Sequence, residues 1–567
     1  MTFTLDKFLK FLPAAMFAMV CEFLMNLVDS AVCGHVLGED ALAAVNLMQP
    51  VLCLVEFLAL LVGTGTSVLF AVESGRFDRR RASEYLTQGL WSALMVGGAA
   101  LVALAVFREK AAEAFGVHGA VLEGVKEYWL WFLPCVVVEP VAFYLSCVCY
   151  ADGDEKICIL AYAVQLAANF AVSCALTMRL GIAGCAIGTA VGHILAISVL
   201  AFHFRKKTNS LRFAKHFSFA DTLRICKCSM GEASSRLAQA ALMLALNLYI
   251  VSRLGAEMLP VLAVVVAVLE LAAVFDGVPR AMQPLASVYI GEKNDRLAMR
   301  ILRYATAGSL ATGILATVLL AVFPQIATAI VGMGDSALAA EAHKAVRIVS
   351  AGLAGTAVVA LFNMYWTCLG KETLALALTA GAMLFAPLLL FPALGEMFGA
   401  NGVWMAMALA PYAALGATAA FIAVKWGRKA LPHFLSSERA RKMRVYDTIV
   451  DEAAVCALSR KINRFLAVRR NLGGRKASIA ALLAEETLLL VKDHNPGRRI
   501  RAEVTLDFSA KDTLYVTIRD DGEIFDITDA DAKVSSLRSY LVSNLMENLP
   551  GRRNLTTTGF NRNAFKL

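Results

Sequence analysis

Two stretches of the sequence, GRFDRRRA at 75–82 and GEKNDRLA at 291–298, share a glycine, an arginine five positions later and an alanine two positions after that. They lie 216 positions apart (291 minus 75). A turn at Gly153 recurs 217 positions later at Gly370, and a Gly-x-x-Gly pattern at 181–184 recurs 218 positions later at 399–402. Three landmarks at nearly one offset predict an internal duplication, with two halves packed about a central cleft.

The composition places the chain in a lipid bilayer. Of its 567 residues, 58% are apolar and the mean hydropathy is +0.63, too apolar for a water-soluble protein. A membrane-spanning helix needs about 20 mostly apolar residues. We therefore predict an all-α polytopic membrane protein with an N-lobe at 1–210 and a C-lobe at 211–427, six spans in each. The twelve spans are expected near 8–33, 41–73, 84–107, 127–150, 157–178, 182–204, 229–252, 258–290, 299–322, 345–369, 373–393 and 401–425.

Basic residues in the connections predict the orientation, because positively charged loops stay in the cytoplasm. With the N-terminus inside, the inner side holds the basic runs 79–81, 205–207, 293–303 and 428–429, whereas the outer loops carry few Lys or Arg residues. The net charge of +9 then reflects topology and contact with lipid headgroups rather than a nucleic-acid partner. We expect a multi-pass protein of the bacterial inner (plasma) membrane with both termini cytoplasmic.

Cysteine usage predicts neither a disulfide framework nor a metal site. Most of the 13 cysteines lie in apolar spans, where they act as small hydrophobic residues. Cys226 and Cys228 have no second cysteine pair and no histidine close by in the sequence.

The first span carries the strongest candidate for function. Glu22, Asn26 and Asp29 follow at i, i+4 and i+7, which puts them on one stripe of a helix. Ionisable groups in hydrocarbon are costly unless they face a cavity or polar partners. A carboxyl group there could gain and lose a proton, as ion-coupled transport requires. The alternative is that this stripe only forms hydrogen bonds with neighbouring helices.

Other intramembrane acids fall into two groups. Glu232 with Arg236, and Asp276 with Arg280, have the i, i+4 spacing that lets one helix neutralise its own charge, and we expect structural pairs. Glu56, Glu139 and Glu270 have no evident local partner, and each could line the cleft. Gln283 precedes a proline within a long span, where a bend could serve a conformational change or simple packing.

The composition changes after the last span. Residues 428–445 form a basic linker with interleaved apolar residues, suited to the membrane surface or to water. From about 446 to 567 the chain reads as a soluble domain, with a helix at 479–494 and two strands at 500–508 and 514–519. We predict a cytoplasmic α/β sandwich domain.

Several motifs of the first 430 residues resemble the multidrug and toxic compound extrusion (MATE) family. They are the run 26–30, Gly34 to Gly38, Ala41 to Ala44, Pro50, Gly63, Gly65, the loop 75–82, Ala151 to Asp154, Gly181 to Gly184, Gln283 with Pro284, Gly370 and Asn401 to Trp404. The resemblance implies two six-helix lobes around a V-shaped cleft and export of organic cations or amphipathic drugs against H⁺ or Na⁺.

In this resemblance Asp29 matches the acid that prokaryotic members use for cation coupling. The family often has Asn-x-x-x-Asp on the fifth span, but here Asn169 is followed by Ser173, so a second coupling carboxyl is missing from that helix. Coupling would then depend on Asp29, with Glu22 or Glu56 as further groups.

The tail resembles the GHKL ATP-binding fold of anti-sigma-factor serine kinases. The similar segments are 484–494, 518–526 and 559–565. The resemblance assigns Glu486 to a nucleotide site and Asp520 with Gly522 to its adenine end. Four residues after Glu486, however, stands Leu490 in place of a Mg²⁺-binding Asn, and no glycine-rich lid motif follows Asp526. We expect a degenerate nucleotide fold that acts as a regulatory or docking module, without kinase activity.

These observations favour a secondary active exporter over an enzyme. Its expected partners are a small cationic or amphipathic substrate, membrane lipids and a cytoplasmic protein that contacts the tail. The coupling ion is H⁺ or Na⁺, and ATP at the C-terminal domain, though doubtful, is the one further cofactor considered. Two alternatives stay open. One is a flippase for lipid-linked precursors or polysaccharides, which the mostly acidic intramembrane charges disfavour. The other is a membrane sensor that signals through its C-terminal domain.

Overall fold

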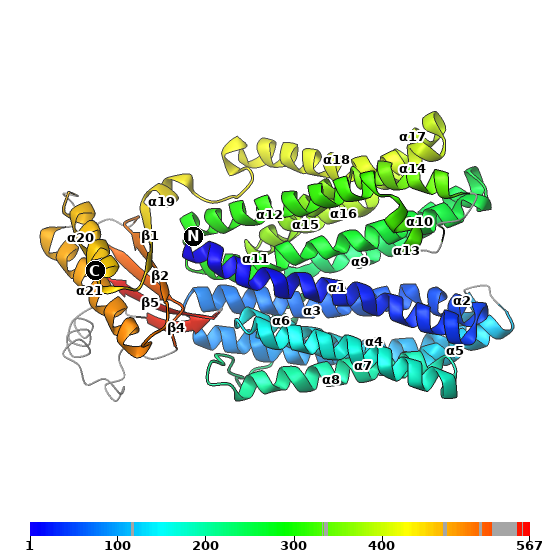
Figure 1. Cartoon of the computed structure of the whole chain (residues 1–567), viewed down its shortest axis with the longest axis horizontal. Helices are drawn as coiled ribbons and strands as arrows, with labels where there is room; N and C mark the ends of the chain where they lie inside the picture. Colours follow the sequence, from blue (N-terminus) through cyan, green and yellow to red (C-terminus); the bar gives the residue numbers. More distant parts are fainter. Residues whose placement is uncertain are drawn as a thin grey trace.

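The computed structural model describes residues 1–114, 118–330, 333, 338–468, 473–509, 513–523, 553–557 and 559–567. Helices fill one elongated body, and a small sheet with two long helices lies at one end of it (Figure 1). The N-terminus lies at that same end, beside the sheet (Figure 1). We call this end the domain side and the opposite end the far side.

The first half of the chain forms one layer of the body (Figure 1). Its helices are α1 (Phe3–Leu37), α2 (Glu39–Leu47), α3 (Gln49–Gly75), α4 (Arg79–Ala114), α5 (Ala120–Phe132), α6 (Cys135–Ala151), α7 (Glu155–Leu180) and α8 (Ala183–Ala201). The span predicted at 41–73 is interrupted at Met48, and Pro50 stands in the first turn of α3, where its missing N–H costs nothing.

The second half forms the other layer, most of it on the opposite side of α1 and α3 (Figure 1). It contains α9 (Phe219–Arg253), α10 (Leu259–Ala272), α11 (Gly277–Gly291), α12 (Asp295–Val322), α13 (Gln325–Ile330), α14 (Ala339–Ser350), α15 (Leu353–Cys368), α16 (Glu372–Ala380), α17 (Ala386–Phe398) and α18 (Ala400–Trp426). Helix α11 continues without a break through Pro284.

Within the described residues, 10 helices are long and apolar enough to cross a membrane. Two further pairs qualify when each is taken as one span, α5 with α6 bent by 48° and α14 with α15 bent by 42°. The resulting range of 10 to 12 includes the predicted number of spans.

The repeated loops have the same backbone in both halves. Phe77 and Lys293, each two residues after the loop glycine, both adopt left-handed φ angles of 61° and 57°. Asp78 and Asn294, again at equivalent positions, accept hydrogen bonds from the backbone N–H groups of Arg81 and Leu297 at 2.9 and 3.1 Å. Each side chain thereby satisfies a free N–H group at the start of the helix that follows. The same capping interaction thus forms the same turn in both halves of the chain.

The two halves touch on the domain side through glycine. Helix α3 ends at Gly75 and α11 ends at Gly291, and a Cβ atom on either glycine would overlap backbone of the other helix. Around this crossing a core of buried side chains joins α1, α3, α11, α12 and α15. The bundle is therefore tightly closed at the end that carries the sheet.

The C-terminal domain contains an antiparallel sheet in the order β1-β2-β3-β5-β4. Its strands are β1 (Met443–Ile449), β2 (Arg501–Asp507), β3 (Tyr515–Asp520), β4 (Arg553–Thr557) and β5 (Phe560–Lys566), and its helices are α19 (Ser437–Arg441), α20 (Glu452–Ala467) and α21 (Gly473–His494). The predicted helix and both predicted strands match α21, β2 and β3. The predicted linker 428–445 is too long, because α19 and the start of β1 lie within it.

The two faces of this sheet differ in chemistry. Val504, Val516 and Ile518 belong to a buried apolar cluster with α20 and α21. The alternate residues, which include Glu503, Arg519 and Arg562, face the bundle. Residues 524–552, which include the end of the segment resembling an adenine motif and the region predicted to lack a lid motif, lie outside the described residues.

Candidate transport cavity between the lobes

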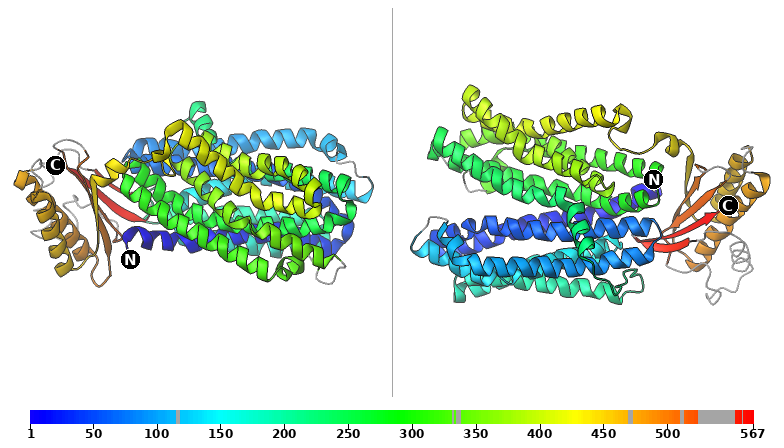
Figure 2. Two further views of the ribbon diagram at one scale, coloured as in Figure 1. Left: turned by 90° about the horizontal axis from the view of Figure 1, so that it is seen from above. Right: turned by 180° about the vertical axis from the view of Figure 1, so that it is seen from behind.

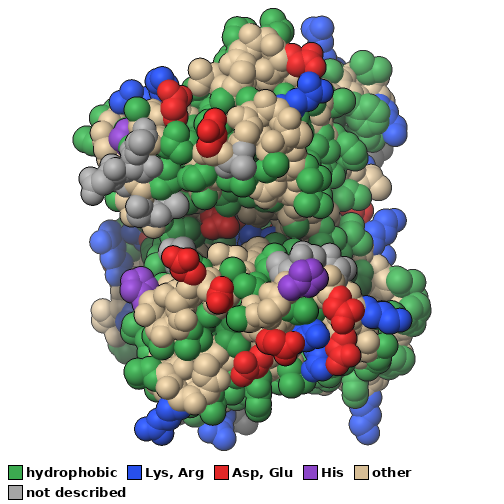
Figure 3. All heavy atoms as spheres, turned by 90° about the vertical axis from the view of Figure 1, so that its right-hand side faces the viewer, with side chains coloured by type: hydrophobic (Ala, Val, Ile, Leu, Met, Phe, Trp, Pro, Cys, Tyr) green, Lys and Arg blue, Asp and Glu red, His purple; other side chains and the backbone are tan. Residues whose placement is uncertain are grey.

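A cavity of about 160 Å³ lies in the middle of the bundle, with walls from both halves of the chain. Helices α1, α3, α6, α7 and α8 contribute one wall, and α9, α10 and α11 the other. Seen from the far side, a groove crosses the surface between the halves and acidic side chains show in its depth (Figure 3). The cavity thus lies beneath an opening on the far side, while the glycine crossing closes the domain side.

Asp29 lines this cavity and is 6% exposed. Its Oδ2 accepts hydrogen bonds from the Tyr128 hydroxyl at 2.9 Å and from the Thr189 hydroxyl at 3.0 Å. Asn169 donates from its amide to Thr189 at 2.8 Å. Within the part of the chain that the structure describes, Oδ1 of Asp29 has no hydrogen-bond partner and the carboxyl forms no ion pair with Lys or Arg. Neutral donors therefore hold an acid that borders the cavity.

The other acid of the predicted stripe has a different partner. Glu22 lies 3.3 Å from a guanidinium nitrogen of Arg280 on α11, and Arg280 also lies 3.7 Å from Glu232 on α9. In a second pair, Arg236 of α9 lies 3.3 Å from Glu56 of α3. Glu22–Arg280 and Glu56–Arg236 thus join the two halves of the chain.

These contacts correct the expected pairing along single helices. Arg236 and Arg280 reach carboxylates across the cavity, so the pairs that form differ from Glu232–Arg236 and Asp276–Arg280. The i, i+4 spacing permits a pair on one helix, but a carboxylate that faces the same cavity from another helix competes for the guanidinium. Sequence spacing contains no information about that second helix.

The remaining predicted residues divide between the cavity and its surroundings. Glu139 lines the cavity with one oxygen 3.7 Å from Nε2 of His193, and the Gln165 amide lies 3.0 Å from Nδ1 of the same ring. Glu270 also lines the cavity. The side chain of Asn26 lies outside the described part of the structure.

Two predicted residues lie away from the main cavity. The hydroxyl of Ser173 packs between α7 and α8 and donates to the Cys185 carbonyl at 3.4 Å. Gln283 bonds to Ser67 and lines a smaller neighbouring cavity toward the domain side. Gly188 of α8 brings that helix directly against Ser173, which places this hydroxyl between two helices.

Sequence reasoning missed three groups of the site, Tyr128, Thr189 and His193. His193 was detectable as an ionisable side chain inside an apolar span. Tyr128 and Thr189 gave no such signal, since tyrosine and threonine are common in membrane helices and neither stands near Asp29 in the sequence.

The residues assigned to a nucleotide site lie in the C-terminal domain. Asp520 ends β3, and its Oδ1 accepts hydrogen bonds from the Gly522 N–H at 3.1 Å and from the Asn561 amide at 2.8 Å. Burial raises the pKa of Asp520 to about 6. Glu486 is half-buried on α21, which packs over the sheet. The structure thus brings Asp520 and Gly522 into one hydrogen-bonded turn.

A long helical bundle in two halves, with a polar cavity between them and ion pairs across it, is the architecture of a membrane transporter. Comparisons with known proteins agree with that class. Residues 14–175 match the family model MatE. No curated protein matches the chain.

Solved structures match the bundle as a whole. One is a MOP superfamily transporter from Pyrococcus furiosus, which is 19% identical and gives a TM-score of 0.68. Its binding pocket is described as having reverse polarity, which suggests a different function for that protein. A MATE in complex with MaL6 gives the same values. An outward-facing conformation of a multidrug resistance MATE family transporter gives 18% identity and 0.68. Each match covers 75% of this chain and 95% of the other.

At these identities the solved structures show the fold. The chain has the fold of MATE transporters, and residues 14–175 form a MatE domain. Together these matches indicate a transporter and not an enzyme.

Proposed function

We propose that the protein is a secondary active exporter that exchanges organic cations or amphipathic compounds for H⁺ or Na⁺ by alternating access. The observation that carries the proposal is Asp29, which borders the central cavity and is held by two neutral hydroxyl groups. A carboxyl group in this setting can bind a cation or a proton in exchange, whereas one paired with arginine has its charge already satisfied.

The charge of the cavity supports a cationic cargo. Among the described residues that line it, five carry carboxyl groups and two carry guanidinium groups. The acids are Glu22, Asp29, Glu56, Glu139 and Glu270, and the cations are Arg236 and Arg280. Both arginines already pair with glutamates, so the uncompensated charge is negative. A flippase for phosphate-bearing lipids would need cationic groups available in the same place.

In the proposed cycle the ionised Asp29 attracts the cargo from the domain side. Entry of the coupling ion from the far side neutralises the carboxylate, which releases the cargo and permits the return. The membrane potential supplies about 2.3 kcal/mol per charge for each 100 mV, enough for one ion to drive a useful gradient. We assign the domain side to the cytoplasm of a bacterial inner membrane, because the basic loops cluster there.

The test is efflux from vesicles that contain the purified protein, with an imposed pH or sodium gradient and a small panel of cationic dyes. We expect gradient-dependent movement of at least one dye, abolished by a protonophore or a sodium ionophore according to the coupling ion. Transport of anionic or lipid-linked compounds, with no response to any cationic dye, would refute the proposal.

We further propose that the C-terminal domain is a degenerate GHKL-like fold with a regulatory or docking role. The turn around Asp520 and Gly522 supports a vestigial nucleotide site, and Leu490 stands where a magnesium ligand would be needed. Equilibrium binding of labelled ATP to the full chain tests this, since tight magnesium-dependent binding would contradict degeneracy and favour the sensor alternative.

A further inference from the structure

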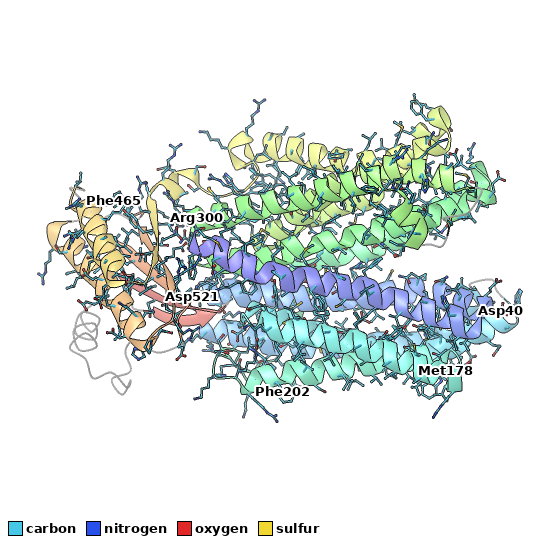
Figure 4. All side chains as sticks on the ribbon, in the orientation of Figure 1. Asp40, Met178, Phe202, Arg300, Phe465 and Asp521 are labelled. Atoms are coloured by element: carbon cyan, nitrogen blue, oxygen red, sulfur yellow. The ribbon has the colours of Figure 1, made fainter. Side chains whose placement is uncertain are left out.

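The C-terminal sheet spans both halves of the transporter on the domain side. Its strand order places β1 at one edge and β4 beside β5 at the other. Seen from behind, β4 and β5 reach the ends of the first-half helices, while the opposite part of the sheet extends toward the second half (Figure 2). Arg300 of α12 and Asp521 after β3 both lie along this junction (Figure 4).

The centre of the junction is a buried cluster formed by Glu292, Arg519 and Arg562. Glu292 belongs to the second repeated loop and is paired with Arg519 of β3 and, at 2.6 Å, with Arg562 of β5. Both arginine side chains are 0% exposed, and that of Glu292 is 6% exposed. Such charges are costly to leave without partners, so the cluster holds the sheet firmly to the second half.

Arg562 extends the same cluster to the first half. Its second guanidinium nitrogen donates to the carbonyl of Ser74 at 2.5 Å, at the end of α3. The guanidinium carbon lies 4.5 Å from the ring centre of Phe77, in the first repeated loop. One side chain of the C-terminal domain thus contacts the equivalent loops of both halves.

Further contacts attach the sheet to both halves, and the start of α1 reaches β1 as well, where the Phe3 N–H donates to Asp447 at 2.9 Å. At the β1 edge, Arg296 of α12 donates to the Met443 carbonyl at 2.7 Å, and Arg300 lies 3.1 Å from Asp447. At the β5 side, Lys7 of α1 donates to the Gly559 carbonyl at 2.9 Å. The Phe3 and Phe560 rings meet edge to face with centres 5.5 Å apart.

A hydrogen-bonded sheet resists stretching across its strands, because widening would break its backbone hydrogen bonds. The halves must nevertheless separate on this side if alternating access is to open it. They cannot do so while the sheet stays bound to both loops.

We propose that the C-terminal domain locks the domain side closed through the cluster of Glu292, Arg519 and Arg562, and that one half must leave the sheet before this side can open. The inference rests on the proposed alternating-access function. The equilibrium between the two access states is thereby set from outside the membrane, so the domain controls transport without contacting the cargo.

Single-molecule energy transfer across the domain side tests the lock. Dyes are attached to unnatural amino acids that replace Lys207 in the first half and Thr373 in the second. Both residues are exposed, and neither forms a hydrogen bond or ion pair with the described part of the sheet. The full chain is held in lipid nanodiscs without cargo or gradient. We expect one predominant high-transfer population in this reference protein, and a low-transfer, open population that grows roughly 5-fold or more in Glu292→Gln and in Arg562→Gln.

The double variant should open no further than either single variant, because all three break one cluster. Glu523→Gln is the matched control, since it removes a carboxylate of the same domain that pairs with Arg498 at an exposed site, and it should leave the distribution unchanged. Glu292 lies in the bundle and Arg562 lies in the sheet. If one of the two variants fails to fold, the energy-transfer measurement on the other variant still tests the lock.

Unchanged transfer in the cluster variants, or equal opening in the control, would overturn the lock. The measurement needs no cargo, so absence of transport would refute the proposed function without affecting this result. Conversely, if the protein exports dyes normally but both cluster variants stay closed, the lock is refuted and the proposed function is not.

Discussion

Glu22 and Asp29 stand two turns apart on α1 and border the same cavity, but their partners differ in kind. Glu22 meets Arg280 from the other half of the chain, whereas Asp29 meets the hydroxyls of Tyr128 and Thr189 from its own half. An acid with a cation across the interface stabilises one arrangement of the two halves. An acid with neutral donors leaves its charge available to a mobile ion.

The same contrast recurs outside the membrane. Glu292 is paired with two arginines and joins the C-terminal domain to the bundle, whereas Asp520 is held by a backbone N–H and an amide within the domain. Cationic partners thus accompany the carboxylate that joins two parts of the molecule, and neutral partners accompany the carboxylate held within one domain.

A substitution of Asp29 is the most direct test of the difference between the two acids of α1. We expect Asp29→Asn to lower gradient-driven efflux by roughly 100-fold or more, because the amide cannot exchange a proton or neutralise a cation. The measurement is dye efflux from vesicles at matched protein content. Asp40→Asn, at an exposed position near the far side, is the control and should transport normally (Figure 4). Full activity of Asp29→Asn would assign coupling to another group.

Removal of the cross-lobe cation should have a smaller effect. Arg280→Gln leaves Glu22 and Glu232 without their cation, which costs about 3 kcal/mol in the closed arrangement. We expect transport to fall roughly 10-fold while its dependence on the driving gradient persists. Adding Glu22→Gln to this variant should restore part of the rate, since the stranded carboxylate disappears. If Arg280→Gln instead abolished gradient dependence, the distinction between the two acids of α1 would fail.

The smallest expected effect is on the pH dependence of the stability of the C-terminal domain, through Asp520. Its pKa is raised by burial to about 6, above the ordinary value of about 3.9. The folded domain therefore gains stability from the protonated form, fully present below about pH 4 and lost as the pH rises through 6. Asp520→Asn should remove this part of the pH dependence, a difference of about 1–3 kcal/mol between pH 4 and pH 8. Hydrogen exchange of β3 amides in the full chain measures it; identical pH profiles would contradict the assignment.

The sequence predicted those features that one segment encodes by itself. The spans follow from apolar length, and the two repeated loops follow from a glycine and a capping residue at one offset, with Asp78 and Asn294 performing the same task. The stripe on α1 follows from helical periodicity, which placed Glu22 and Asp29 on the cavity.

The sequence did not predict contacts between distant segments of the chain. Arg236 and Arg280 were assigned to partners on their own helices, because nothing in the spacing shows that α1 and α3 bring carboxylates across the cavity. Tyr128 and Thr189 are 99 and 160 positions from Asp29. The role of Glu292 depends on arginines more than two hundred residues away, and only the folded chain shows that pairing.

The glycine crossing of α3 and α11 has a consequence for mutational scanning. A methyl group at Gly75 would overlap the carbonyl oxygen of Val288, and one at Gly291 that of Val72. Alanine at either position therefore acts as a wedge that is tolerated only when the two helix ends have moved apart. The smallest possible side-chain enlargement would bias the molecule toward the conformer not seen here, and so provides a simple genetic means of trapping it.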